Sequence, residues 1–330
     1  MNPMNQRAMM LVFLPALLSC QTAGGNGSDA DVPVDPAQDE PVDAPDTPPD
    51  TPGDPDADVV PDVVPDIVDT LPPPDGAIII DHNSVALFDS IPDTFIGQAA
   101  ALTSLFLHAS VGGTINTGLD CLAGNLETRA YCESISEPRY DRSAWVFQAH
   151  ANGSCMGKLQ DLVDAVPANP GYNVYHQKYC YFEGLDSLGD NCCGVPPTPE
   201  TTAESFDAYV AAMNGLEAAN PGAVFVWWTT PYVQNEGHVC ANDWNTRMRA
   251  YARENGKVLF DIGDIETCSP DGVPTLVDGL EAAFPPYCGE ETGPSCHPDF
   301  PKEGSGPDGG NVRLAKAWWV MMARLAGWEP

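Results

Sequence analysis

A serine followed by two glycines is the clearest point in this chain where residue types and spacing indicate chemistry. Ser110 follows the apolar segment 104–107 and the dipeptide His108-Ala109, and Gly112 and Gly113 come shortly after it. This order predicts a turn from a strand into a helix, which can expose the hydroxyl and direct backbone N–H groups at a bound oxyanion. It is not the GxSxG elbow of α/β-hydrolases, and an ordinary helix N-cap is the structural alternative.

Five short apolar segments predict the sheet that carries this turn. Most are continuously apolar rather than alternating, which is typical of parallel strands covered on both faces. They are SLFL at 104–107, WVFQ at 145–148, VYHQKYCYF at 174–182, AVFVWWT at 223–229 and KVLFDI at 257–262.

Helical patterns separate these strands and close the chain. The segment 202–219 shows the i, i+3, i+4 spacing of one apolar helix face. The strand–helix alternation predicts an α/β fold, a three-layer α/β/α sandwich with a mostly parallel five-stranded sheet. In such a sheet the functional site lies at the carboxyl ends of the strands. The other expected helices cover 115–122, 156–166, 243–254 and 311–325.

Further motifs accompany the Ser110 turn over about 78–328. They are DHNS at 81–84, HASVGGTINTGLDCL at 108–122, KYCY at 178–181, WTTP at 228–231, DWNTRMRAYARENGKVLFDIGDIE at 243–266 and AKAWWVMMARLAGW at 315–328. Together they resemble the SGNH/GDSL hydrolase superfamily, in a divergent branch with an HxSVG-type first block. The resemblance implies a flavodoxin-like sandwich and a serine hydrolase that acts on esters, often of carbohydrates, and we expect no cofactor.

The resemblance assigns roles to single residues. Ser110 is the expected nucleophile and, through its own N–H, a donor of the oxyanion hole. Gly153, in the loop after 145–148, matches the second-block glycine and is the second expected donor. The third block normally supplies an asparagine, which is missing after 174–182, so the third donor stays open.

The last block of the family places a histidine shortly before the final helix, and His297 occupies that position. Position 294, where the family has an aspartate, is proline. His297 is therefore expected either to act with Ser110 as a dyad or to receive an orienting carboxylate from elsewhere. The candidate orienting acids are Glu291, Asp299 and Asp271. Candidate auxiliary residues, with a structural role as the alternative, are His108, His150 and Lys178. The histidines expected to be structural or at the surface are His82, His176 and His238.

The N-terminus predicts export and lipidation. The apolar run over 8–18 is shorter than the roughly 20 residues that span a bilayer, and it follows a short segment with one positive charge, as in a signal peptide. Leu17-Leu18-Ser19-Cys20 resembles the lipobox of bacterial lipoproteins. Residues 1–19 are therefore expected to be a lipoprotein signal peptide, and Cys20 a lipid-bearing anchor to the membrane of the bacterial envelope, in the outer membrane or at the cell surface.

Composition separates a tether from a folded domain. Residues 21–75 contain 15 Asp or Glu, 13 Pro and no Lys or Arg, so 20–75 is expected to be a lipidated cysteine followed by a disordered tether. Residues 76–330 are expected to form the hydrolase domain. Of the total charge of −33, this domain carries −19, which excludes nucleic-acid binding through phosphate contacts.

The cysteine count predicts disulfide bonds. Eleven cysteines are present, and ten remain when Cys20 is set aside. An even number in an exported chain is typical of a disulfide framework, in which the adjacent Cys192 and Cys193 are expected to have different partners. No metal site is expected, because the chain has no CxxC pair and no HExxH motif.

Two functions stay open at this point. One is an envelope-anchored serine esterase that acts on a small-molecule or polysaccharide ester, with O-acyl groups of carbohydrate as the candidate substrate. The other is a non-catalytic surface-binding or structural lipoprotein that retains the fold. The presence of Ser110, Gly112, Gly153 and His297 favours the esterase, and the missing third-block asparagine and Pro294 favour the alternative.

Overall fold

The central strands send alternate side chains to two separate apolar cores. In the computed structural model, β5 (Val224–Trp228) directs Val226 and Trp228 to one face of the sheet and Phe225 and Trp227 to the other. Successive strand residues point to opposite faces, so a strand buried on both sides must be apolar throughout. This double burial explains the continuous apolar runs of the sequence.

The structure describes residues 76–150, 153–289, 295–301 and 309–330, all within a compact unit that extends from Val68 to Pro330. The expected signal peptide, Cys20 and tether lie outside the described residues, as does Glu291. Within the described ranges, no helix is both long enough and apolar enough to cross a membrane.

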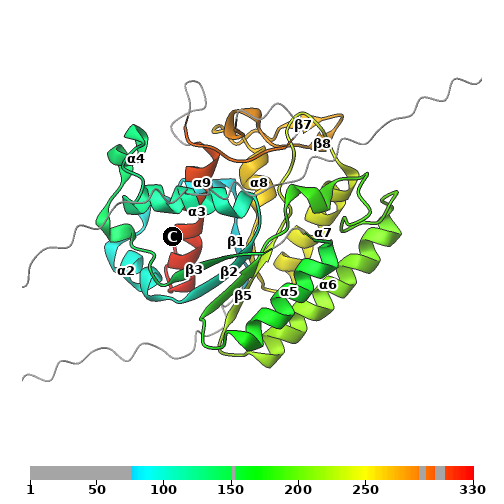
Figure 1. Cartoon of the computed structure of the whole chain (residues 1–330), viewed down its shortest axis with the longest axis horizontal. Coiled ribbons are helices and arrows are strands. Elements are labelled where there is room, and N and C mark those ends of the chain that lie inside the picture. Colours follow the sequence, from blue (N-terminus) through cyan, green and yellow to red (C-terminus); the bar gives the residue numbers. More distant parts are fainter. Residues whose placement is uncertain (1–75, 151–152, 290–294, 302–308) are drawn as a thin grey trace, which may run out of the picture. The chain divides into compact units, whose positions relative to one another are not determined.

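Six strands, rather than the five expected, form a parallel sheet in the order β1-β6-β5-β4-β2-β3 (Figure 1). The additional strand is β1, which pairs with β6 so that Ile80 lies opposite Phe260. Three residues are too few for a periodic pattern, and tertiary pairing makes this segment a strand. The remaining bounds are β1 (Ile78–Ile80), β2 (Ser104–His108), β3 (Trp145–Ala149), β4 (Val174–Gln177) and β6 (Val258–Phe260).

Helices cover both faces of the sheet. In Figure 1, α3 and α9 lie on one side of the strands and α5, α6 and α7 on the other, and the two apolar cores follow the same division. The bounds are α1 (His82–Val85), α2 (Asp93–Ala101), α3 (Val111–Ala123), α4 (Ala130–Ile135), α5 (Cys155–Ala168), α6 (Pro199–Ala219), α7 (Val239–Glu254), α8 (Ile262–Thr267) and α9 (Gly310–Leu325). Short elements are η1 (Phe88–Ser90), η2 (Pro138–Tyr140), η3 (Tyr181–Gly184), η4 (Pro285–Tyr287), β7 (Leu276–Val277) and β8 (Leu280–Glu281).

The strand expected over 174–182 ends at Gln177. Gln177 is the last residue of β4 that pairs with β2, which itself ends at His108 before the turn at Ser110. Beyond this point a buried ion pair connects η3 to α5. The Lys158 ammonium lies 2.7 Å from the Glu183 carboxylate, and both side chains are fully buried. β4 ends because its pairing with β2 ends at Gln177, and not because the apolar pattern changes.

Helix α9 lies deep in the first core. Trp318 and Trp319 are fully buried, so both belong to the core. Helix α3 packs closely against α9 at Gly118, where a Cβ atom would lie 2.2 Å from the Asn311 carbonyl oxygen. A glycine at this point allows the two backbones to approach each other.

Four disulfides join the described cysteines, and the different partners expected for Cys192 and Cys193 are confirmed. Cys192 is bonded to Cys155 of α5, and Cys193 to Cys240 of α7. Both bonds therefore attach one loop to the helices of the second face. The other two are Cys121–Cys132 and Cys288–Cys296. Among the described residues, the cysteines that form no disulfide are Cys180 and Cys268.

Candidate active site

Ser110 has a backbone conformation that L-residues rarely adopt. It lies between β2 and α3 with φ 51° and ψ −113°. The Gly112 N–H donates to the Ala109 carbonyl at 3.1 Å and the Gly113 N–H to the Ser110 carbonyl at 2.7 Å, which closes the turn. Within the fully described α3, the Ser110 hydroxyl makes no capping hydrogen bond. A strained residue of this kind costs about 1–3 kcal/mol, and such residues cluster at functional sites.

The structure brings the Ser110 hydroxyl together with the His297 imidazole. Oγ of Ser110 and Nε2 of His297 are hydrogen-bonded, although the two residues are 187 positions apart in the chain. Ser110 is half-buried, so its hydroxyl remains partly accessible. The pair therefore has the contact that a nucleophile and its general base require.

The segment around His297 is held by covalent and noncovalent contacts. The disulfide Cys288–Cys296 closes the chain directly before it, and the Gly289 N–H donates to the His297 carbonyl at 2.8 Å. The Tyr181 ring meets the imidazole edge to face, with centroids 5.9 Å apart. Tyr181 and this disulfide were not among the site residues expected from the sequence. The only signals were the KYCYF segment and two cysteines near His297.

His108 packs beneath the Ser110 turn. Its side chain is buried and stacks on Phe106, and a Cβ atom at Gly112 would lie 2.3 Å from the His108 Cβ. Burial, with smaller contributions from Lys178 and His150, lowers the His108 pKa to about 4. The ring is therefore neutral at neutral pH. These contacts give His108 a supporting position under the turn.

The other two auxiliary candidates lie in different surroundings. The His150 backbone N–H donates to the His108 carbonyl at 3.0 Å, and its ring Nδ1 lies 3.2 Å from the Asp161 carboxylate. The Lys178 ammonium is fully buried and donates to the Tyr179 carbonyl at 3.1 Å. Burial lowers the pKa of Lys178 to about 8. Its ammonium is enclosed by protein, which separates it from a substrate that enters from solvent.

Gly153 lies in the loop between β3 and α5, immediately before Ser154, the N-cap of α5. It is exposed, and the position that a Cβ atom would occupy has open space within 4 Å. Residues 151 and 152 of the same loop lie outside the described residues. The loop follows β3, the strand beside β2, so Gly153 and Ser110 both follow the carboxyl ends of adjacent strands.

The candidate orienting acids are distributed over different parts of the chain. Asp299 accepts a hydrogen bond from the Phe300 N–H at 2.9 Å, and its own N–H donates to the Tyr287 carbonyl at 3.1 Å. Asp271 is exposed in the turn 269–272, whose Gly272 lies beside the His82 ring. Asp271 therefore belongs to the segment beside His82. Glu291 lies outside the described residues.

The two cysteines outside disulfides do not offer a ready thiolate. Cys180 and Cys268 are both buried. Burial raises the pKa of the Cys180 thiol, and burial together with the nearby Asp264 raises that of Cys268 to about 12. A thiol is nucleophilic only when it is deprotonated. Ser110, which is half-buried and hydrogen-bonded to an imidazole, has neither of these restrictions.

No protein-family model, curated protein or solved structure matches this chain. A function is therefore inferred from the geometry of the described residues. Its central features are a hydroxyl on a strained turn, an imidazole hydrogen-bonded to that hydroxyl, and a disulfide next to the imidazole.

Proposed function

We propose that residues 76–330 form a serine hydrolase of the SGNH type that cleaves acyl esters. The observation that carries this proposal is the hydrogen bond between Ser110 Oγ and His297 Nε2 on a strained turn at the carboxyl edge of the sheet. A serine with a purely structural role at this position would be expected to cap α3. The contact with a remote histidine instead favours nucleophilic catalysis.

The strand order supports the proposal. Without β1, the sheet reads β6-β5-β4-β2-β3, which is the 2-1-3-4-5 order of flavodoxin-like folds when the strands are renumbered from β2. From β2 the chain first adds β3 on one side and then β4 on the other. Doubly wound sheets bind ligands at this point of reversal. Ser110 follows β2 directly and so lies there.

The proposed reaction proceeds through an acyl-enzyme. Nε2 of His297 accepts the hydroxyl proton while Ser110 Oγ attacks the acyl carbonyl carbon. The N–H groups of Ser110 and Gly153 would stabilise the resulting oxyanion. His297 then donates the proton to the departing alcohol. Water attacks the acyl-enzyme, His297 accepts a proton from that water, and the carboxylic acid leaves as Ser110 regains its hydroxyl.

Charge restricts the substrates that fit this proposal. With a net charge of −19, residues 76–330 repel anionic molecules, so neutral esters are favoured. O-acyl groups of carbohydrate are the substrate class that we propose. We further propose that lipidated Cys20 attaches the protein to the bacterial envelope, where a polysaccharide ester would be within reach of the domain.

Labelling with a fluorophosphonate probe tests the hydrolase directly. The folded protein should be labelled and should hydrolyse p-nitrophenyl acetate, and Ser110→Ala should remove both properties. Ser143→Ala is the matched control, because Ser143 is an exposed serine whose backbone N–H and hydroxyl donate to the neighbouring Asp141 carboxylate. Labelling that persists in Ser110→Ala would contradict the assignment. A folded wild-type protein that neither labels nor hydrolyses the ester would instead support a non-catalytic binding protein.

A further inference from the structure

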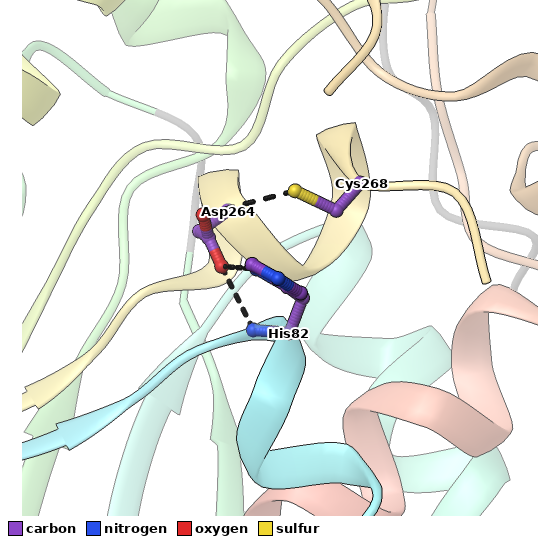
Figure 2. Close-up of side chains that lie close together, drawn as sticks. All are labelled: His82, Asp264 and Cys268. Atoms are coloured by element: carbon purple, nitrogen blue, oxygen red, sulfur yellow. Dashed lines mark hydrogen bonds and ion pairs between the residues drawn. The ribbon is translucent and has the colours of Figure 1, made fainter. Parts of the chain in front are cut away.

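A second cluster of polar side chains lies at the carboxyl end of β1, the edge strand on the far side of the sheet from β3. His82, Asp264 and Cys268 each offer one ligand atom, and these atoms all lie within 4.8 Å of one another (Figure 2). The His82 Nδ1 atom is 2.6 Å from one carboxylate oxygen of Asp264, and the Cys268 Sγ atom is 3.8 Å from the other. The carboxylate therefore lies between the imidazole and the thiol.

Strand pairing places these three residues together. Ile80 of β1 lies opposite Phe260 of β6, so the segments that follow the two strands leave the sheet side by side. His82 begins α1 directly after β1. Asp264 belongs to α8, and Cys268 follows four residues later, on the same face of the helical turn. The backbone N–H of His82 also donates to the Asp264 carboxylate at 2.8 Å, which fixes the orientation of that carboxylate.

We propose that His82, Asp264 and Cys268 bind a divalent transition-metal ion of the zinc type. Nitrogen, carboxylate oxygen and sulfur are together the donor set of zinc, whereas calcium and magnesium prefer oxygen alone. Bonds of about 2.0–2.3 Å in a tetrahedron separate ligand atoms by roughly 3.3–3.7 Å. The His82–Asp264 pair would need to open by roughly 0.7 Å and the widest pair to close by up to roughly 1.1 Å, which side-chain rotations achieve.

Charge and cysteine usage support the same site. Burial and Asp264 keep the Cys268 thiol protonated in the metal-free protein, but a bound metal ion displaces that proton. The resulting thiolate and the carboxylate, with a neutral imidazole, balance the two positive charges of the ion. Eight of the ten described cysteines are in disulfides, whereas Cys268 is unpaired, buried and adjacent to two other ligands. Cys180, the other unpaired thiol, has the buried charges of Lys178, Glu183 and Lys158 nearby. Three protein ligands would leave one coordination position for water.

The cluster is separate from the proposed esterase site. β1 forms one edge of the sheet, and three strands lie between it and β2. At 4.7–4.9 Å per strand, the two strands are about 19 Å apart. An ion bound here would link α1 to α8 and stabilise the β1 edge. It would take no part in ester hydrolysis, so this inference is independent of the proposed function.

Cobalt substitution tests the site in the full chain with its disulfides intact. After treatment with a chelator, added Co²⁺ should give the visible spectrum of a tetrahedral complex with a thiolate-to-cobalt charge-transfer band, and Zn²⁺ should displace it. Cys268→Ser should remove that band. His82→Asn and Asp264→Asn should each weaken Zn²⁺ binding by at least about 10- to 100-fold. Cys180→Ser is the matched control and should bind like the parent chain.

Stability gives a second measurement. Zn²⁺ at about 100 times its Kd should raise the unfolding midpoint by about 5–10 °C in a domain of this size. A Co²⁺ spectrum without the charge-transfer band, or Zn²⁺ affinity unchanged in Cys268→Ser and His82→Asn, would overturn the proposal and leave His82–Asp264 as a structural ion pair. The spectrum of the parent chain decides the matter even if a variant fails to fold.

Discussion

The Ser110–His297 pair and the His82–Asp264–Cys268 cluster both lie at the carboxyl ends of strands in one sheet, but their imidazoles have different partners. In each, an imidazole meets a side chain more than 180 positions away. The imidazole partner is a hydroxyl in the first and a carboxylate in the second. A hydroxyl can give its proton to the ring and attack a carbonyl, whereas a carboxylate beside a thiol supplies further metal ligands. The chemistry available to each histidine thus depends on the partner that tertiary contacts provide.

The two histidines are also held differently. His82 lies in the first turn of α1, where Asp81 and Ser84 form a capping box. His297 lies in irregular chain beside the disulfide Cys288–Cys296. The general base that we propose must be placed within a fraction of an ångström, so a segment without regular structure needs this additional restraint.

The largest effect should distinguish the proposed catalytic pair, Ser110 and His297, from other histidines. Ser110→Ala and His297→Ala should each lower kcat/KM for p-nitrophenyl acetate by at least about 1,000-fold, because each removes a participant in the same proton transfer. The control is His238→Asn, because His238 is a histidine outside the proposed site, with its Nδ1 3.8 Å from the Asp186 carboxylate. Equal losses in all three variants would show that the effect is not specific to the pair.

Alanine substitutions at the adjacent Gly112 and Gly113 test how closely His108 packs against the strained turn. Gly112→Ala should lower the free energy of unfolding by about 3 kcal/mol, because the new Cβ would lie 2.3 Å from the His108 Cβ. Gly113→Ala should be neutral or stabilise by about 0.4–1 kcal/mol, since its Cβ position is open within 4 Å. Urea titration of both variants measures the difference. Similar stabilities would show that His108 does not restrict this turn.

The disulfide next to His297 should matter for catalysis more than a disulfide elsewhere. Replacing Cys288 and Cys296 together by serine should lower kcat by about 10- to 100-fold with little change in KM, since the base loses its position while the remaining contacts persist. Replacing Cys121 and Cys132 together is the control and should leave kcat unchanged. Steady-state kinetics on folded, disulfide-checked protein distinguishes the two. An unchanged kcat in the first variant would show that noncovalent contacts suffice.

The smallest effect is expected for His176, a buried histidine whose ring nitrogens have neither a hydroxyl nor a carboxylate partner among the described residues. Among the described residues neither ring nitrogen of His176 has a hydrogen-bond partner, and the ring stacks on Trp318 at 4.7 Å. Burial lowers its pKa from 6.5 to about 3, so the unfolded chain binds the proton more readily and stability falls as the pH drops below 6.5. His176→Phe should abolish about 2 kcal/mol of the loss between pH 7 and pH 5. Urea titrations at both pH values measure it, and an identical loss in both proteins would refute the assignment.

Local patterns allowed much of the fold to be predicted. All five expected strands lie in the central sheet, although 174–182 was too long because pairing with β2 ends at Gln177. The expected helix over 115–122 begins earlier, at Val111, directly after Ser110. β1 was missed because its apolar run, Ile78–Ile80, has only three residues and is shorter than the segments taken as strands. Strand ends and short edge strands depend on neighbours that periodicity does not reveal.

The sequence by itself determined the residue types: apolar strands that need cover on both faces, a serine at a strand–helix turn, and an even number of cysteines once Cys20 is set aside. The tertiary structure decided the partners. It placed His297 at Ser110, Asp264 at His82, and Cys155 and Cys240 at the adjacent Cys192 and Cys193. The reason is physical: periodicity reports local burial, whereas contacts between residues far apart exist only when the sheet orders its strands and brings their carboxyl ends to one edge.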